Sequence, residues 1–250
     1  MTSDNQNIYK LAFLFHIMKK IELIRMLEKY PLFTFNEFVR ITGNGVKYCR
    51  THIYRLKKEK LIFEIEKGKY TVHENPFLFA SLISFPSYIS FWTALRFYNL
   101  TDQLPIHIMI ASKKSRKEID FLGTKIKFYK IKHFWGYNKT RYEKFDIFMA
   151  EPEKCLVDSI LMKLVPLNEI AKAIGSKEIN LNKLKEFAIK TKNKSLIKRV
   201  GFLIEQNGAN ADELSKHIDY NYIRLDAFHK KKGEKNKKWR IINNLNNDFN

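Results

Sequence analysis

The sequence has few of the residues and motifs that mark disulfide-linked, metal-binding or hydrolytic proteins. Its 250 residues include two cysteines, Cys49 and Cys155, which lie far apart and outside any Cys-x-x-Cys motif. A zinc module or a disulfide framework is therefore not expected. The seven histidines do not cluster at metal-ligand spacing, so we expect no metal site and no cofactor. Because a nucleophile elbow, a P-loop and a His-Glu-x-x-His motif are also missing, we expect a protein that is not an enzyme and has no catalytic residues.

Long hydrophobic runs are scarce as well. The longest apolar stretch, from Phe77 to Phe97, is interrupted by serines, Pro86 and Arg96 and is too broken to span a membrane. The first ten residues are polar and lack the basic segment and apolar core of a secretion signal. We therefore expect a soluble, cytoplasmic protein without a membrane partner.

Acidic residues are few relative to basic ones. The chain has 46 Lys and Arg against 26 Asp and Glu, which gives a formal net charge of +20. An excess of this size favours a polyanionic partner, because binding to phosphates releases condensed counterions. A genome rich in A/T offers an alternative explanation, but it accounts for the choice of Lys over Arg better than for the shortage of acids.

The first 45 residues predict two helices. Residues from about Tyr9 to Glu28 have apolar side chains at helical spacing, and Pro31 ends that helix; the apolar residues are Leu11, Leu14, Phe15, Met18 and Ile21. The following Thr34 and Glu37 fit a capping box, which predicts a second helix with Phe35, Phe38 and Val39 on its buried side. Gly43 fits a left-handed stop after this helix.

A third helix, over residues 46–60, is the most informative segment. At 100° per residue, one narrow face holds Val46, Cys49, Ile53 and Leu56. The opposite side carries basic and hydrogen-bonding residues and no acid, namely Lys47, Tyr48, Thr51, Arg55 and Lys58, with Tyr54 beside them and Arg50 on the flank. Two short strands follow, with a turn at Lys67-Gly68 and lysines at 67 and 69.

This order of three helices and a hairpin is typical of a winged helix-turn-helix, in which the third helix enters the DNA major groove. Arg55 and Lys47 could bind guanine edges, Thr51 could contact a thymine methyl group, and the tyrosines could donate to phosphate. We therefore predict a DNA-binding site made of Lys47, Tyr48, Arg50, Thr51, Tyr54, Arg55, Lys58, Lys67 and Lys69. Two alternatives are a solvated basic face and a winged helix that binds protein.

The remaining sequence predicts a larger mixed domain. Residues 75–100 predict two helices divided by Pro86, with Tyr88, Phe91 and Leu95 in the core. Residues 105–111 predict a strand with alternating buried isoleucines at 106, 108 and 110, followed by a strand pair turning at Gly123. From Pro152 to His217 the pattern is helical, and the tail has a basic loop at residues 230–238 and a strand that follows Trp239.

The predicted fold class is therefore α+β: an N-terminal winged helix-turn-helix followed by a larger mixed domain with a small antiparallel sheet and a helical C-terminal part. The expected boundaries are residues 1–74 for the DNA-binding domain and 75–250 for the second domain. The second domain is expected to hold its sheet at about 75–150 and its helices at about 151–250.

Several stretches along the chain resemble the AbiEi family of antitoxins from type IV, abortive-infection toxin-antitoxin systems. The stretches are KGKYTV, SYISFWTALRFYNLTDQLP, GTKIKFYKI, AEPEKCLVDSI, KRVGFLIEQNG and KWRIINNL. The resemblance implies a transcriptional autorepressor that binds the operator of its own operon and counters a nucleotidyltransferase-like toxin in phage defence. Operator binding is expected to involve either a homodimer or cooperative monomers. Two other functions stay open: a nucleic-acid-processing enzyme that uses the winged helix to bind its substrate, and an adaptor for an acidic protein.

Overall fold

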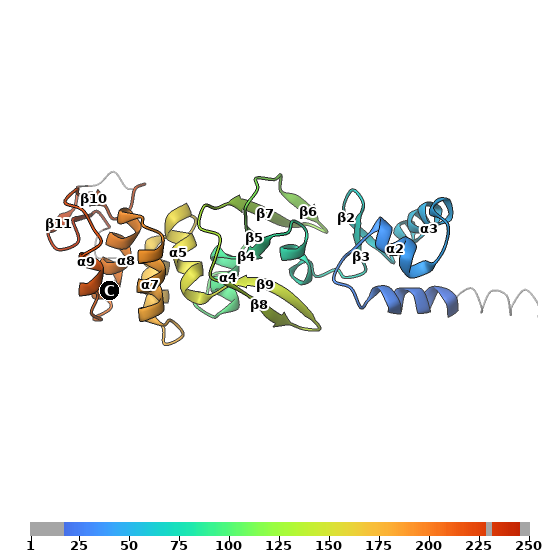
Figure 1. Cartoon of the computed structure of the whole chain (residues 1–250), viewed down its shortest axis with the longest axis horizontal. Helices are drawn as coiled ribbons and strands as arrows, with labels where there is room; N and C mark the ends of the chain where they lie inside the picture. The colour runs from blue at the N-terminus through green and yellow to red at the C-terminus, as the bar shows by residue number, and fades with distance from the viewer. Residues whose placement is uncertain (1–17, 229–231, 246–250) are drawn as a thin grey trace, which may run out of the picture. The chain divides into compact units, whose positions relative to one another are not determined.

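The computed structural model describes residues 18–228 and 232–245, which form two compact units (Figure 1). The first unit contains the described residues up to Ala80 together with residues 119–124 and 141–146, and the second contains the rest. Helices and strands occur in both halves of the chain, which confirms the α+β class. The domain boundary after residue 74 stays a prediction.

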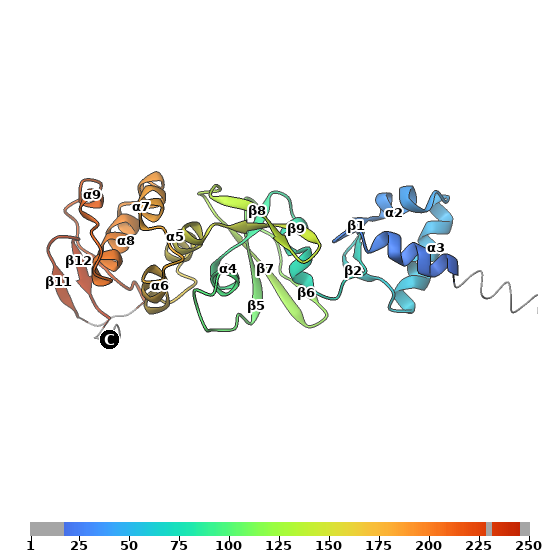
Figure 2. The same cartoon turned by 90° about the horizontal axis from the view of Figure 1, so that it is seen from below.

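The first unit begins with a helix over residues 18–27. The elements that follow are β1 (Phe33–Thr34), α2 (Phe35–Thr42), α3 (Val46–Lys58), β2 (Phe63–Glu66) and β3 (Lys69–Thr71); β1 is labelled in Figure 2 and the other four in Figure 1. The strands form a small antiparallel sheet in the order β1-β3-β2, in which Phe33 pairs with Tyr70. A short strand placed before α2 therefore ties the helices to the hairpin.

Local sequence signals determine where α2 begins and ends. The Thr34 hydroxyl accepts a hydrogen bond from the Glu37 amide at 3.3 Å, and the Glu37 carboxylate accepts one from the Thr34 amide at 2.6 Å, so the predicted capping box is confirmed. Gly43 ends the helix with φ +66°, a left-handed conformation that glycine adopts without strain. The predicted turn at Lys67-Gly68 also lies between β2 and β3.

An apolar cluster packs the helices of the first unit against its small sheet. It includes Leu27, Phe33, Phe38, Cys49 and Leu56, all at most 1% exposed. The face predicted for the first helix is wrong in its described part, because Met18 and Ile21 are exposed while Leu23 and Leu27 point into the cluster. The other predicted members of that face, Leu11, Leu14 and Phe15, lie outside the described residues.

The second region of the chain contains a six-stranded sheet (Figure 2). Its strands are β4 (Ser87–Ile89), β5 (His107–Ser112), β6 (Ile119–Phe121), β7 (Thr124–Lys130), β8 (Tyr137–Tyr142) and β9 (Phe145–Ala150). They lie in the order β6-β7-β5-β4-β9-β8, with β4 antiparallel to β5 and parallel to β9, and β5 parallel to β7. The sheet is therefore mixed, and the prediction of a small antiparallel sheet is wrong.

Residues 75–100 also differ from expectation. The predicted first helix is replaced by two single 3₁₀ turns, Pro76–Leu78 and Ala80–Leu82, and Tyr88 lies in β4 rather than in a helix. Only α4 (Phe91–Phe97) is helical, and it packs against β5. Strand β5 is buried on both faces, so its burial does not alternate, and Ile106 lies just before it at 93% exposure.

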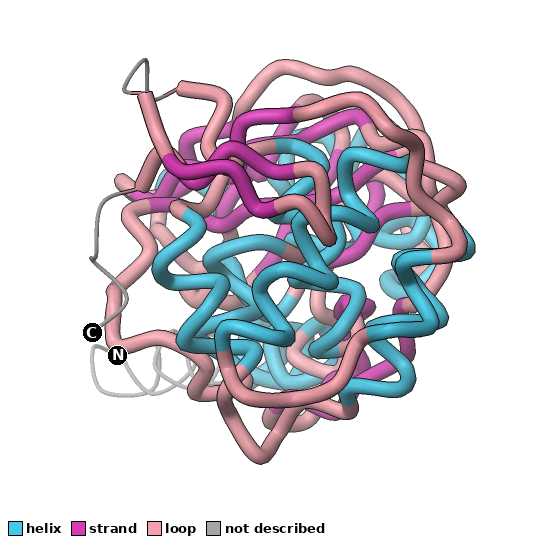
Figure 3. The backbone as a smooth tube through the Cα atoms, turned by 90° about the vertical axis from the view of Figure 1, so that its left-hand side faces the viewer, coloured by secondary structure: helices cyan, strands magenta, loops and turns pink. Residues whose placement is uncertain are grey.

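The C-terminal part of the second unit is mainly helical, as predicted. Its elements are α5 (Pro152–Met162), α6 (Leu167–Ile174), α7 (Leu181–Lys190), α8 (Lys194–Gln206), α9 (Asp212–Ser215), β10 (Ile223–Arg224), β11 (Glu234–Asn236) and β12 (Ile241–Asn243). Figure 3 views this end and shows strands (magenta) running beside helices (cyan). The predicted basic loop at 230–238 is partly strand β11, and residues 229–231 lie outside the described part.

The Trp239 side chain packs the C-terminal strands against helix α8. Its side chain is fully buried, and its ring packs on Gly201 of α8, where an added Cβ would lie 2.2 Å from the ring. Its indole N–H donates to Glu205 at 2.6 Å. The absence of a side chain at position 201 therefore lets the indole lie directly on the α8 backbone.

A buried polar cluster joins α5 to β4. Lys154 and Asp158, one helical turn apart, form an ion pair with side chains 0% and 1% exposed. Asp158 also accepts hydrogen bonds from the hydroxyls of Tyr88 at 2.9 Å and Ser90 at 3.0 Å, and Lys154 donates to Tyr88 at 2.9 Å. Burial lowers the pKa of Lys154 and raises that of Asp158, and each charge partly offsets the effect on the other.

Candidate nucleic-acid interface

Helix α3 is held in place by one apolar stripe. Cys49, Ile53 and Leu56 are 0%, 5% and 1% exposed and belong to the core of the first unit, as predicted. Val46, predicted to share this stripe, is 50% exposed, and that prediction is wrong. Val46 is the first residue of the helix and lies one turn before Cys49, where the apolar cluster ends. The buried face of α3 therefore begins at Cys49.

A tight turn connects α2 to α3 and determines where α3 begins. Gly45 is the N-terminal cap residue of α3, in an extended conformation, and only Asn44 lies between it and Gly43. Thr42 donates its hydroxyl to the Phe38 carbonyl at 3.0 Å and contacts the Cys49 sulfur at 3.3 Å. The Cys49 thiol donates to the Asn44 carbonyl at 3.6 Å. The buried Cys49 thus helps to stabilise the turn that sets the direction of α3.

The side of α3 opposite the core is open to solvent. Eight of the nine residues predicted to contact DNA are exposed, and the ninth is half-buried: the exposed ones are Lys47, Tyr48, Arg50, Thr51, Tyr54, Arg55, Lys58 and Lys67, and the half-buried one is Lys69. The seven on α3 come from a single helix face and its flanks, while Lys67 and Lys69 come from the β2–β3 hairpin. All nine residues belong to the first unit.

The cations of this face lack acidic partners. Helix α3 contains no Asp or Glu. Within the described residues, ion pairs involve none of the four cations Lys47, Arg50, Arg55 and Lys58. Unpaired, solvent-exposed ammonium and guanidinium groups attract polyanions over roughly a Debye length, about 8 Å at physiological ionic strength. The face therefore carries a concentrated positive charge.

The nearby acids pair with cations at the edge of this face instead. Lys57 donates to Glu64 of β2, and Lys20 of the first helix lies 2.7 Å from Glu59, just after α3. These pairs join α3 to the hairpin and to the first helix. Exposed pairs contribute little energy, about 0–1 kcal/mol each, so the apolar stripe remains the main support of α3.

Four of the predicted residues border a single hollow in the surface, together with Gly45 and His52; the four are Lys47, Tyr48, Thr51 and Arg55. The Tyr48 ring meets the His52 ring edge-on at a centroid distance of 5.5 Å, and His52 in turn contacts Phe38 at 5.8 Å. His52 is not among the residues predicted to contact DNA. Its position in a chain of rings shows that it supports Tyr48.

The two lysines of the β2–β3 hairpin differ in their surroundings. Lys69 lies 3.0 Å from Glu66, and Lys67 stands at the turn. Behind them Tyr70 belongs to the core, and burial raises its pKa, with a smaller contribution from Glu64. Of the two hairpin lysines, Lys67 therefore offers the more accessible charge.

The described residues contain neither a candidate metal site nor a membrane-spanning helix. Within 18–228 and 232–245, no group of three or more His, Cys, Asp or Glu side chains is arranged to hold a metal ion. In the same ranges, every helix is too short or too polar to cross a lipid bilayer.

Comparison with known proteins identifies a similar fold. No family model matches the chain, and no curated protein matches it. The chain resembles the crystal structure of the RV2827C protein from Mycobacterium tuberculosis. The two structures superpose with a TM-score of 0.63 over 84% of this chain and 85% of the other, at 14% sequence identity. Similarity at this identity shows a shared fold alone.

Proposed function

We propose that residues 18–72 form a winged helix-turn-helix and that α3 is its recognition helix. The order of a helix, α2, a tight turn, α3 and the β2–β3 hairpin supports this assignment, as does the short strand β1 that completes the sheet. The observation that carries the proposal is the acid-free outer side of α3, whose cations have no acidic partner among the described residues while the inner side is buried.

The chemistry of this face suits a DNA duplex. An exposed arginine such as Arg55 can donate two hydrogen bonds to a guanine edge, Lys47 can donate to the same acceptors, and the Thr51 methyl can contact thymine. Tyr48 and Tyr54, at 54% and 66% exposure, carry hydroxyl groups that can donate to phosphate. Lys67 at the hairpin turn would contact the DNA backbone or the minor groove.

We further propose that the protein is a transcriptional autorepressor and antitoxin of a toxin-antitoxin system. The support is the sequence resemblance to the AbiEi family together with the proposed DNA-binding surface. On this proposal the first unit binds the operator of the protein's own operon, as a homodimer or as cooperative monomers, and the second unit counters a nucleotidyltransferase-like toxin. The protein would have no catalytic activity, so incubation with DNA or nucleotides and Mg²⁺ should give neither cleavage nor nucleotide transfer.

Fluorescence anisotropy with a labelled duplex from the region upstream of the gene tests the proposal. The Arg55→Ala and Lys47→Ala variants should each lose about 10–100-fold of the preference for this duplex over a random one, since a good base contact contributes about 1–3 kcal/mol. The logarithmic salt slope should fall by about 0.9 for each phosphate contact removed, as in a variant that lacks the proposed backbone contact of Lys67.

A matched control is Lys177→Ala, which removes one exposed lysine from the second unit, between α6 and α7. It changes the net charge by the same amount and should bind the duplex like the parent. Parent-like binding by both α3 variants would refute the assignment of α3. An equal loss in the Lys177→Ala variant would show that overall charge, rather than this face, drives binding.

A further inference from the structure

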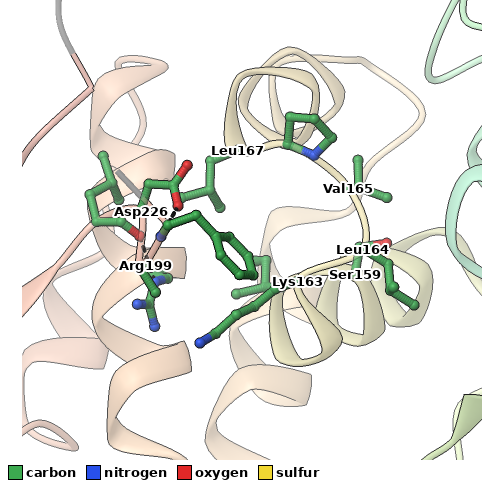
Figure 4. A pocket seen from close by; sticks show the side chains of 12 residues that line it. Ser159, Lys163, Leu164, Val165, Leu167, Arg199 and Asp226 are labelled. Atoms are coloured by element: carbon green, nitrogen blue, oxygen red, sulfur yellow. Dashed lines mark hydrogen bonds between the residues drawn. The ribbon is translucent and has the colours of Figure 1, made fainter. Parts of the chain in front are cut away.

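A cavity in the second unit lies among three helices and a loop (Figure 4). Its volume is about 320 Å³, at the lower end of the range typical of small-molecule sites. The walls come from the end of α5, the α5–α6 connection, α8 and residues 225–228. The apolar lining consists of Ile160, Leu164, Val165, Pro166, Leu167, Leu225, Ala227 and Phe228. A ligand for this cavity would therefore need an apolar body.

The charged groups of the lining are two cations, Lys163 and Arg199, and one acid, Asp226. In Figure 4 the nitrogens of Lys163 and Arg199 lie toward the same edge of the pocket, whereas Leu164, Val165 and Leu167 occupy other sides of it. Asp226 accepts a hydrogen bond from the Phe228 amide at 2.7 Å. The lining therefore combines an apolar wall with an excess of one positive charge.

Arg199 is held in place by backbone carbonyl groups, and the negative charge of Asp226 offsets part of its positive charge. Its guanidinium donates to the backbone carbonyls of Leu225 at 2.8 Å, Arg224 at 2.9 Å and Ser195 at 3.3 Å. Carbonyl oxygens satisfy hydrogen bonds but leave the positive charge in place. Burial lowers the pKa of Arg199, yet an arginine side chain stays protonated at neutral pH. The guanidinium thus supplies a fixed positive field beside an apolar cavity.

Lys163 supplies a second, adaptable cation. It is exposed, and its Nζ lies 5.5 Å from the centre of the Phe228 ring. Among the described residues it forms no ion pair, so its ammonium is available to a ligand anion. The nearby start of α6 has Pro166 as its cap residue and no side-chain cap, which adds the positive end of a helix dipole on the same wall.

We propose that this cavity binds a small monoanionic carboxylate with a short apolar body. The carboxylate would bind the Lys163 ammonium within the field of Arg199, and the hydrocarbon body would pack against Ile160, Leu164 and Phe228. The site lies in the second unit, whereas α3 lies in the first, so this inference goes beyond the proposed DNA-binding function and does not depend on it.

Titration of the full chain with hexanoate, followed by isothermal calorimetry and by chemical shifts in the NMR spectrum, tests the proposal. Hexan-1-ol has the same hydrocarbon chain without the charge and should bind at least about 10-fold more weakly, because a hydrogen bond between charged groups is stronger than a neutral one. The Lys163→Gln variant should reduce hexanoate affinity by a similar factor. It keeps most of the side-chain length at this left-handed position, and circular dichroism would verify its fold.

Two further variants complete the test. Ala227→Trp introduces a bulky ring at an exposed position of the lining and should abolish binding of both probes. Lys177→Gln removes the same charge as Lys163→Gln outside the cavity and should leave hexanoate affinity unchanged. The proposal is overturned if hexanol binds as tightly as hexanoate, if Lys163→Gln binds hexanoate like the parent, or if hexanoate does not bind at millimolar concentration.

Discussion

Removal of one partner from the buried Lys154–Asp158 pair should destabilise the second unit severely. In a Lys154→Met variant, methionine fills much of the lysine volume, but the Asp158 carboxylate loses its only cationic partner among the described residues. It keeps the hydroxyl donors of Tyr88 and Ser90, which do not neutralise its charge. Breaking a buried pair in this way costs about 3–5 kcal/mol, a large share of the roughly 5–15 kcal/mol that stabilises a typical domain.

Urea unfolding followed by tryptophan fluorescence measures this loss selectively. The chain has three tryptophans, at positions 92, 135 and 239, and all lie in the second unit. Their emission therefore reports the unfolding of that unit alone. The midpoint should fall with the slope unchanged, since a change of stability rather than of exposed surface is expected.

The pH dependence gives a sharper criterion. Burial raises the pKa of Asp158 already in the parent, and loss of the lysine raises it further. Near the raised pKa the folded variant binds a proton that the unfolded chain does not bind, so this group favours folding at low pH and opposes it as the pH rises. The deficit relative to the parent should therefore shrink between pH 7 and about pH 4.

A double variant separates charge from shape. Lys154→Met with Asp158→Leu removes both charges and should recover part of the loss, because apolar replacements of buried pairs are often tolerated. A loss below about 1 kcal/mol for Lys154→Met at pH 7, or a deficit that grows on acidification, would refute the reasoning.

Two further stability predictions follow from local contacts. Thr34→Ala removes the capping box of α2 and should lower the stability of the first unit by about 0.5–2 kcal/mol in thermal unfolding followed by circular dichroism, whereas Thr34→Ser should behave like the parent. Gly201→Ala brings a Cβ to 2.2 Å from the Trp239 ring, so we expect a loss of about 1–3 kcal/mol and altered tryptophan emission. Unchanged emission and stability would show that the indole has room to move.

Features set by a few neighbouring residues were predictable from the sequence. The capping box, the left-handed Gly43 and the buried positions 49, 53 and 56 of α3 depend on contacts within one helix or its ends. Val46 fits the same periodicity, but the prediction that it is buried was wrong, because periodicity does not show where the supporting core ends. The exposed face of α3 could be predicted because it consists of the residues of one short helix that lie opposite its buried face.

Features set by distant residues were not predictable. Tyr88 was expected on a helix, but it pairs with Ala111 of β5 and donates to Asp158, which lies 70 residues away. Ile106 was expected to be buried because its neighbours alternate, yet β5 begins one residue later. The cavity around Lys163 and Arg199 has walls from three separate segments of the chain, residues 159–167, Arg199 and residues 225–228, and therefore left no signal in the linear pattern.

The burial of Trp239 bears on the order in which the protein can fold during synthesis. The apolar cluster beneath α3 is complete within residues 23–72. In the second unit, by contrast, the surface of α8 is covered only once Trp239, near the end of the described residues, has been synthesised. Domains generally fold as units while translation proceeds. A ribosome that stopped before position 239 would thus release a product with an intact α3 and an incomplete second unit. On the proposed function, such a product would compete for the operator without the activity of the second unit.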